Sequence, residues 1–238
     1  MKKLVAALLA GVMVFSLAAC GEEEDFDAKG YVEGVLDATY HGEYKAHAED
    51  VGESEEDIKK ELEDNNIQVA KDALAQSGLT ATDDEIEAYV AMIEDGYKKI
   101  TWTVKDAVKD DNDNFTVDVE ITPVGLLDNL QTIFTNKLQE AVANGVDESG
   151  YMAVFNESVQ ESINQAQTYD PQTVTLNVTY EENSDGDHVY SINESDMEKL
   201  DSIATHMPSI KAEKGQYIVF GVEQSDVKLS KRKNRGAE

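Results

Sequence analysis

Hydrophobic residues in the first hundred positions recur at helical spacing. Between residues 26 and 44 the apolar positions 31, 32, 35, 36 and 40 lie on one face of a helix. Ser54-Glu55-Glu56-Asp57 and Thr82-Asp83-Asp84-Glu85 have the form of capping boxes, which mark helix starts. The apolar stripes that follow these boxes run to Gly78 and Gly96. The pattern predicts three helices before residue 97.

The period then changes from helical to alternating. Ile100, Trp102 and Val104 fall on one side of an extended segment, and alternation returns over 115–121 after the acidic turn 110–114. A second pair of alternating runs, 174–180 and 188–192, is joined by the turn 183–187. The chain therefore predicts two hairpins, each with one buried face.

Helical spacing returns between the hairpins and after the second one. Segments 126–145 and 151–163 carry apolar stripes, and Ser195 is expected to cap a short helix that reaches Ile203. The run 217–222 is a candidate edge strand. Neither hairpin would be stable alone. The order helices, hairpin, helices, hairpin thus predicts an α+β fold in which one antiparallel sheet packs against helices. The two hairpins supply about four strands, and the candidate edge strand 217–222 would be a fifth.

The first twenty residues have a different composition from the rest. Lys2 and Lys3 precede an uncharged run that ends at Cys20, and this run is shorter than the roughly 20 residues of a membrane span. Leu17-Ala18-Ala19-Cys20 resembles the lipobox of bacterial lipoproteins. The resemblance implies cleavage before Cys20, a diacylglyceryl thioether on its thiol and often an acylated amine. A free cysteine in an ordinary signal peptide is the alternative interpretation.

The resemblance divides the chain into four parts. We expect a signal peptide over 1–19, a lipidated tether over 20–25, one composite α+β domain over 26–227 and a basic tail without fixed structure over 228–238. The expected location is the extracytoplasmic face of the cell membrane, with the lipid bilayer bound through Cys20. Since Cys20 is the only cysteine, the domain is expected to fold without a disulfide. A six-residue tether spans at most about 20 Å, which keeps the domain near the outer leaflet.

A second resemblance covers residues 31–44. The order Tyr31-Val32, Leu36-Asp37, Tyr40 and Gly42-Glu43-Tyr44 is similar to the first helix of small uncharacterised lipoproteins from Gram-positive bacteria. This resemblance implies a membrane-anchored extracytoplasmic domain, and it transfers no catalytic residue.

The charge of the chain excludes one class of partner. The sequence has 20 Lys and Arg against 49 Asp and Glu, for a net charge of −29, and five of the basic residues lie in the last eleven positions. Such an acidic body repels phosphate backbones, so no nucleic-acid binding is expected. With 41% hydrophobic residues the chain can still bury a substantial core.

The residues most often used for catalysis and metal binding form no recognisable motif. The four histidines are His41, His47, His188 and His206. They lack metal-ligand spacing, so no metal, cofactor or catalytic residue is predicted. Residues 183–194 place oxygens at EF-hand spacing, but His188 occupies the position where an EF-hand needs glycine, and a hairpin explains the loop better. Ser225-Asp226-Val227-Lys228 matches the Ser-x-x-Lys motif of penicillin-recognising enzymes, but the companion motifs of those enzymes do not follow it.

Aromatic residues leave two interpretations open, a pocket between helices and sheet or, as we favour, the core. They are Tyr31, Tyr40, Tyr44, Tyr89, Tyr97, Trp102 and Tyr180. Our first functional hypothesis is a non-enzymatic module that binds a small molecule, a peptide or an envelope protein in this hollow or on the acidic face. The alternatives are an envelope hydrolase with a dispersed site, in which a histidine pairs with a carboxylate or serine in a cleft, and a spacer whose basic tail binds anionic lipid or wall polymer.

Overall fold

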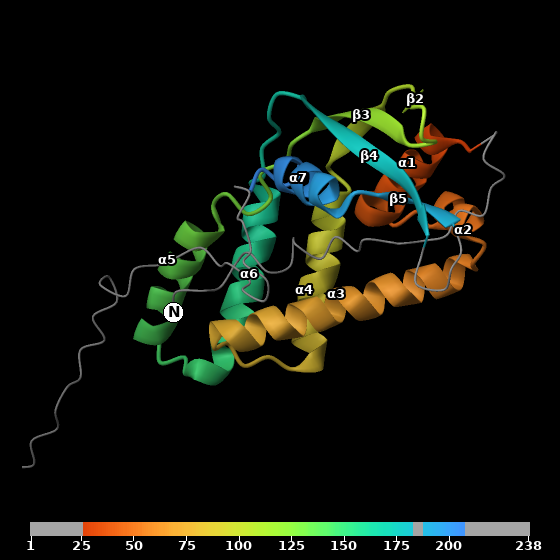
Figure 1. Cartoon of the computed structure of the whole chain (residues 1–238). Helices are drawn as coiled ribbons and strands as arrows, with labels where there is room; N and C mark the ends of the chain where they lie inside the picture. The colour runs from red at the N-terminus through yellow and green to blue at the C-terminus, as the bar shows by residue number, and fades with distance from the viewer. Residues whose placement is uncertain (1–25, 183–187, 208–238) are drawn as a thin grey trace, which may run out of the picture.

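The computed structural model describes residues 26–182 and 188–207, and it has the predicted α+β fold (Figure 1). Its α-helices are α1 Ala28–Leu36, α2 Lys45–Val51, α3 Glu55–Ser77, α4 Asp83–Tyr97, α5 Leu130–Ala143, α6 Tyr151–Asn164 and α7 Glu194–Ala204. Its strands are β1 Thr101–Val104, β2 Val108–Lys109, β3 Phe115–Thr122, β4 Gln172–Glu182 and β5 His188–Ile192. The order helices, hairpin, helices, hairpin is confirmed.

The capping signals place the helix starts correctly. Thr82 and Glu85 form both bonds of the capping box that opens α4. Ser54 accepts a hydrogen bond from the backbone N–H of Asp57 and opens α3. Local hydrogen bonds between neighbouring side chains and backbone therefore decide where these two helices begin.

The first predicted helix is shorter and more irregular than its apolar stripe indicates. After α1 the chain continues as the π-helical turn Asp37–His41, which ends at Gly42 with a φ of +68°. This left-handed conformation is readily adopted by glycine and stops the helix. The chain then starts again as α2, which contains His47. The prediction of a single helix over 26–44 was wrong for this reason.

The strands form one antiparallel sheet. The order is β1-β3-β4-β5, and the short β2 also pairs with β3. The first hairpin joins the second along β3 and β4, from Phe115 opposite Val178 to Ile121 opposite Gln172. The fifth strand of the described sheet is β2, whereas the candidate edge strand 217–222 lies outside the described residues.

One face of the sheet and the helices enclose the main core. Val117, Val119 and Ile121 of β3 are fully buried, as are the inward residues of β4. Helices α1, α4, α6 and α7 contribute side chains to the same cluster. Tyr31, Tyr40 and Tyr89 are 1–3% exposed, so their interpretation as core residues is confirmed. Tyr97, Trp102 and Tyr180 pack against the same cluster, as the favoured core interpretation of these residues requires.

The last described helix, α7, lies beside β4 beyond the end of β5 (Figure 1). Its cap is Asn193, whose side chain accepts from the N–H of Ser195, so the prediction of Ser195 as the cap was wrong. Because Asn193 N–H also bonds to the carbonyl of Asn177, α7 starts where strand pairing stops. Its residues Met197 and Leu200 enter the main core.

None of the helices in the described parts of the chain combines the length and the apolar character that crossing a bilayer requires.

Candidate functional site

The outer face of the sheet is polar and exposed. Thr116, Asp118 and Glu120 alternate with the buried residues of β3, and Thr173, Thr175 and Asn177 do the same on β4. The register places these side chains in rows across the strands, for example Glu120 beside Thr173 and Thr116 beside Asn177. Among the described residues, the helices lie mainly against the other face, and the start of α7 reaches this outer face at Asn177.

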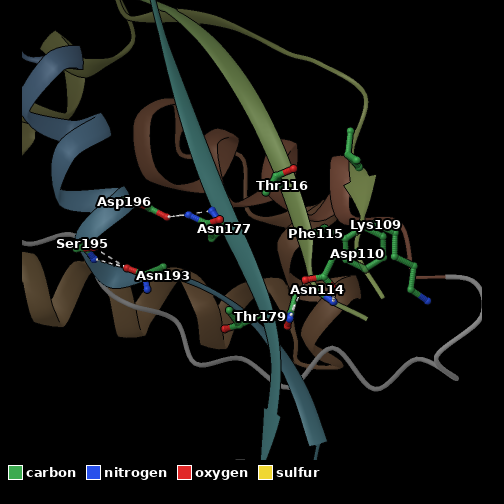
Figure 2. A pocket seen from close by; sticks show the side chains of 11 residues that line it. Lys109, Asp110, Asn114, Phe115, Thr116, Asn177, Thr179, Asn193, Ser195 and Asp196 are labelled. Atoms are coloured by element: carbon green, nitrogen blue, oxygen red, sulfur yellow. Dashed lines mark hydrogen bonds between the residues drawn. The ribbon is translucent and has the colours of Figure 1, made fainter. Parts of the chain in front are cut away.

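A groove of about 490 Å³ lies on the outer face, and we call it the polar groove (Figure 2). It crosses β3 and β4, with the β2–β3 turn on one side and the start of α7 on the other. Its lining residues are Val108, Lys109, Asp110, Asn114, Phe115, Thr116, Asn177, Thr179, Asn193, Ser195 and Asp196. This volume is in the range of small-molecule sites, whereas the predominance of polar side chains favours a polar ligand.

The β2–β3 turn forms one wall of the polar groove. The Asp110 carboxylate accepts hydrogen bonds from the N–H groups of Asn112, at 2.7 Å, and Asn114, at 3.0 Å. These bonds, that from Asn112 foremost, lower the pKa of Asp110 and keep it ionised. Asn114 in turn accepts from the N–H of Tyr180 at 3.0 Å, which fixes the turn to β4.

The start of α7 forms the opposite wall. One carboxylate oxygen of Asp196 accepts from both the backbone N–H and the side-chain amide of Asn177, at 3.0 and 2.7 Å. Asn193 accepts from the N–H and the hydroxyl of Ser195, at 3.0 and 2.7 Å. Figure 2 shows Asp196 turned toward Asn177 of β4 and Ser195 turned toward Asn193, with these bonds drawn as dashed lines. The wall is therefore held to β4 by the bonds of Asp196.

The floor and rim of the groove show what it can bind. Thr116 and Thr179 lie between the two walls, and Phe115, whose ring belongs to the core, also lines the groove. The cation at the rim, Lys109, forms an ion pair of 2.7 Å with Asp113. Hydroxyls, amides and two carboxylates suit a ligand rich in hydrogen-bonding groups, and the lining contains neither histidine nor cysteine.

A second polar cluster lies inside the core. Asp201 of α7 is 6% exposed, and the hydroxyl of Tyr40 donates to its carboxyl at 3.2 Å. Burial raises the pKa of Asp201 to about 7, although the bond from Tyr40 acts in the opposite direction. Tyr97 packs edge-on against Tyr40 with ring centres 5.7 Å apart. This cluster joins α7 to the π-helical turn and to α4.

The three histidines whose side chains the structure describes, His41, His47 and His206, lie in different surroundings. His41 lies within hydrogen-bond distance of the Ile100 carbonyl, and its ring is 4.4 Å from Trp102. His206 lies 3.2 Å from both carboxylate oxygens of Asp128 and stacks on Tyr169 at 3.6 Å.

His47 is fully buried, and burial lowers its pKa to about 4, so it is neutral at physiological pH. The side chain of His188 lies outside the described part of the structure, and its backbone belongs to β5. The hypothesis of an envelope hydrolase with a dispersed site requires a His–carboxylate pair in a cleft. His206 pairs with Asp128, but the His206 side chain is 41% exposed and does not line the polar groove.

The structure also bears on metal binding and on the sequence motifs considered above. Over residues 26–182 and 188–207, no three or more His, Cys, Asp or Glu side chains gather as they would around a metal ion. The segment with EF-hand spacing follows β4 and contains β5, so strands lie on both sides of its turn 183–187, as the hairpin interpretation requires. The lipid-attachment residue Cys20, the Ser225–Lys228 motif and the basic tail lie outside the described residues.

The polar groove was not predicted from the sequence. Its walls come from two segments about eighty residues apart, 108–116 and 193–196, and only the pairing of β3 with β4 places them together. The one sequence signal for this site was the alternation of threonine and asparagine with buried residues along both strands, which marked an exposed polar face.

Comparison with known proteins supports the fold. No protein-family model and no curated protein matches the chain. Among solved structures, the crystal structure of a candidate lipoprotein, YcdA from Bacillus subtilis, is similar with a TM-score of 0.53 and 14% sequence identity. The match covers 74% of this chain and 55% of YcdA, so the chain spans about half the length of that protein.

Proposed function

We propose that this protein is a lipid-anchored extracytoplasmic binding module whose polar ligand occupies the polar groove. The groove is the observation that carries the binding function. It joins hydroxyl, amide and carboxylate groups from strands β3 and β4, the β2–β3 turn and the start of α7 on the outer face of the sheet.

The proposed location rests on the start of the chain. The lipobox ends at Cys20, and the first capping residue of the folded part, Asp27, follows after only six residues. The similar fold of YcdA, itself described as a candidate lipoprotein, supports this location. The proposed anchor is a lipidated Cys20, which holds the domain at the outer surface of the cell membrane.

The lipid anchor is tested by the variant Cys20→Ala. We expect the wild-type protein to enter the detergent phase on Triton X-114 partition of whole cells and to incorporate a clickable palmitate analogue. The variant lacks the thiol that forms the thioether, so it should incorporate none. A matched control, Ser16→Ala, changes a nearby signal residue and should keep the label. Equal labelling of Cys20→Ala and wild type would contradict the proposed anchor.

Ligand binding in the polar groove is tested by placing a bulky cation in it. Thr116→Arg fills the floor of the groove, whereas Thr103→Arg changes the same residue type on the same face outside it. In intact cells, we expect the molecules that cross-link to the full-length wild-type protein to be absent from Thr116→Arg and present with Thr103→Arg.

The measurement is mass spectrometry of cross-linked material, with thermal unfolding of both variants to confirm that each is folded. Loss of the captured material in both variants, or retention in both, would contradict the assignment of the binding site to the groove.

A further inference from the structure

The wall of the polar groove at the start of α7 has acceptor atoms that its own hydrogen bonds do not use. A carboxylate can only accept hydrogen bonds, so the bond between Asp196 and the Asn177 side chain turns the amide nitrogen of Asn177 toward the carboxylate. The amide oxygen of Asn177 then points away from Asp196. Asp196 receives both bonds from Asn177 on one oxygen, Oδ2. Its other oxygen and the Asn177 amide oxygen accept no hydrogen bond from any described residue.

The opposite wall, at the β2–β3 turn, is also short of available donors. The side-chain amide of Asn114 donates to Asp110 at 3.3 Å, and its oxygen accepts from the N–H of Tyr180. The lysine of the lining, Lys109, lies 2.7 Å from the carboxylate of Asp113. Asp110 itself stays ionised, because the bonds from the turn lower its pKa. The groove therefore offers two carboxylates to a ligand, while its lysine is already ion-paired.

Strand β4 sets the separation of these two carboxylates. Asp196 is bonded to Asn177, whereas Asp110 is bonded to Asn114 and, through it, to Tyr180. Asn177 and Tyr180 are three residues apart on β4, which corresponds to about 10 Å of strand. Figure 2 shows the two pairs of side chains on opposite sides of the groove.

This separation argues against a metal ion as the ligand. A calcium ion needs several oxygen ligands within about 2.6 Å of it. Nowhere in the described parts of the chain do three or more acidic or histidine side chains gather closely enough for that. A ligand that neutralises both carboxylates must therefore carry two positive charges at separate positions.

We infer that the ligand of the polar groove is a linear aliphatic diamine or polyamine, with one ammonium group at Asp196 and a second at Asp110. This inference rests on the proposed binding function of the groove and names its ligand class. An ammonium group carries only donors, which matches the unused oxygens of the groove. A phosphate or carboxylate ligand would instead meet two like charges. The net charge of −29 also favours the approach of a dication.

The middle of the groove suits an aliphatic chain. Thr116 and Thr179 lie between the walls, and their methyl groups are available for apolar contact. Val108, which also lines the groove, is 65% exposed, an unusual exposure for a valine in this structure. Burial of these apolar groups under the methylene chain of a diamine would stabilise the complex.

The ligand class is tested by isothermal titration calorimetry on the full-length lipoprotein in a non-ionic detergent. The probe is diaminooctane, whose nitrogens are joined by nine bonds of about 1.5 Å and lie about 11 Å apart when the chain is extended. Aminooctanol has the same length but one charge, and diaminobutane has both charges at about half the spacing. We expect diaminooctane to bind about three- to fivefold more tightly than either compound, as the loss of one exposed ion pair predicts.

Three variants separate the groove from general attraction by an acidic surface. Asp196→Asn and Asp110→Asn each remove one carboxylate of the lining, whereas the control Asp118→Asn removes an exposed carboxylate of the same sheet face outside it. Binding of diaminooctane should weaken about three- to fivefold in the first two and by less than about twofold in the control. Thermal unfolding checks that each variant is folded, and the comparison of the three compounds on wild type depends on no variant.

Two results would overturn the diamine assignment. One is equal affinity of wild type for diaminooctane and aminooctanol, and the other is equal weakening in all three variants. The proposed function is read separately, from the cross-linked molecules that Thr116→Arg should lose. If these molecules are lost in Thr116→Arg but no diamine binds to wild type, the ligand class is wrong and the groove remains the binding site. If diaminooctane binds wild type and not Thr116→Arg, both the site and the ligand class are supported.

Discussion

Asp201→Asn is expected to stabilise the protein at pH 8 and to remove the loss of stability that Asp201 itself contributes between about pH 4 and 7. Asp201 is buried, and its pKa is raised to about 7. In the unfolded chain an aspartate titrates near its ordinary pKa of about 4. Asparagine has a similar shape, stays neutral at every pH and can accept the hydrogen bond from Tyr40.

The sign of this pH dependence follows from the difference in proton binding between the folded and the unfolded protein. Between about pH 4 and 7 the folded protein keeps the proton on Asp201 while the unfolded chain has lost it, so the contribution of Asp201 to the free energy of unfolding falls as the pH rises. Above the folded pKa the charge is buried beside Tyr40 and Tyr97, and the loss is complete. A pKa difference of about three units corresponds to about 4 kcal/mol.

Asp37 and Asp50 also have raised pKa values, first through burial, and act in the same direction. Burial lowers the pKa of His47 to about 4, so His47 acts in the opposite direction between about pH 4 and 6.5, and the contribution of Asp201 is read from the difference between variant and wild type.

The measurement is urea unfolding of wild type and variant at pH 5, 6, 7 and 8, followed by the fluorescence of Trp102. Asp111→Asn removes an exposed carboxylate and serves as the control, which should keep the slope of wild type. If Asp201→Asn has the wild-type slope, or is less stable than wild type at pH 8, then Asp201 does not carry this pH dependence.

Phe155→Ala is expected to lower the free energy of unfolding by about 3–5 kcal/mol, because it leaves a large cavity in the core. Phe155 is fully buried in α6, and its ring lies 5.4 Å from both Tyr89 of α4 and Phe134 of α5. Loss of this one side chain thus removes contacts among three helices.

The same variant tests whether residues 26–227 form one composite domain. If they do, helix content measured by circular dichroism and Trp102 fluorescence from β1 should report one shared transition that moves to lower urea in Phe155→Ala. Phe155→Leu, which keeps most of the volume, should lose less than half as much stability. A variant in which the helical signal shifts while the Trp102 signal does not would show that helices α4 to α6 and the sheet unfold as separate units.

Much of the fold follows from local patterns. The capping residues Ser54 and Thr82 fix helix starts through hydrogen bonds within four residues, so the sequence alone is sufficient to place them. The alternation in 115–121 and 174–178 correctly predicts which faces of β3 and β4 are buried. The break at Gly42 was missed, because the apolar stripe continues through residue 40 and one glycine does not exclude a helix.

The site follows from contacts that local patterns do not contain. Nothing near Asp201 in the sequence marks it as buried, because its partner Tyr40 is 161 residues away. The polar groove likewise depends on the register that sets Thr116 beside Asn177. With 49 acidic residues in the chain, the sequence gives no means to select the few whose surroundings are unusual.

The bond between Asp196 and the backbone N–H of Asn177 also bears on how densely this protein can be packed on a cell. Asn177 lies on β4 just beyond the end of β5, where an unpaired N–H would invite pairing with a strand of a neighbouring molecule. Lipid anchoring confines molecules to two dimensions and raises their local concentration, which favours such aggregation. By occupying this donor with a charged side chain, Asp196 protects this part of the sheet edge, which would help copies held by the proposed lipid anchor to remain separate.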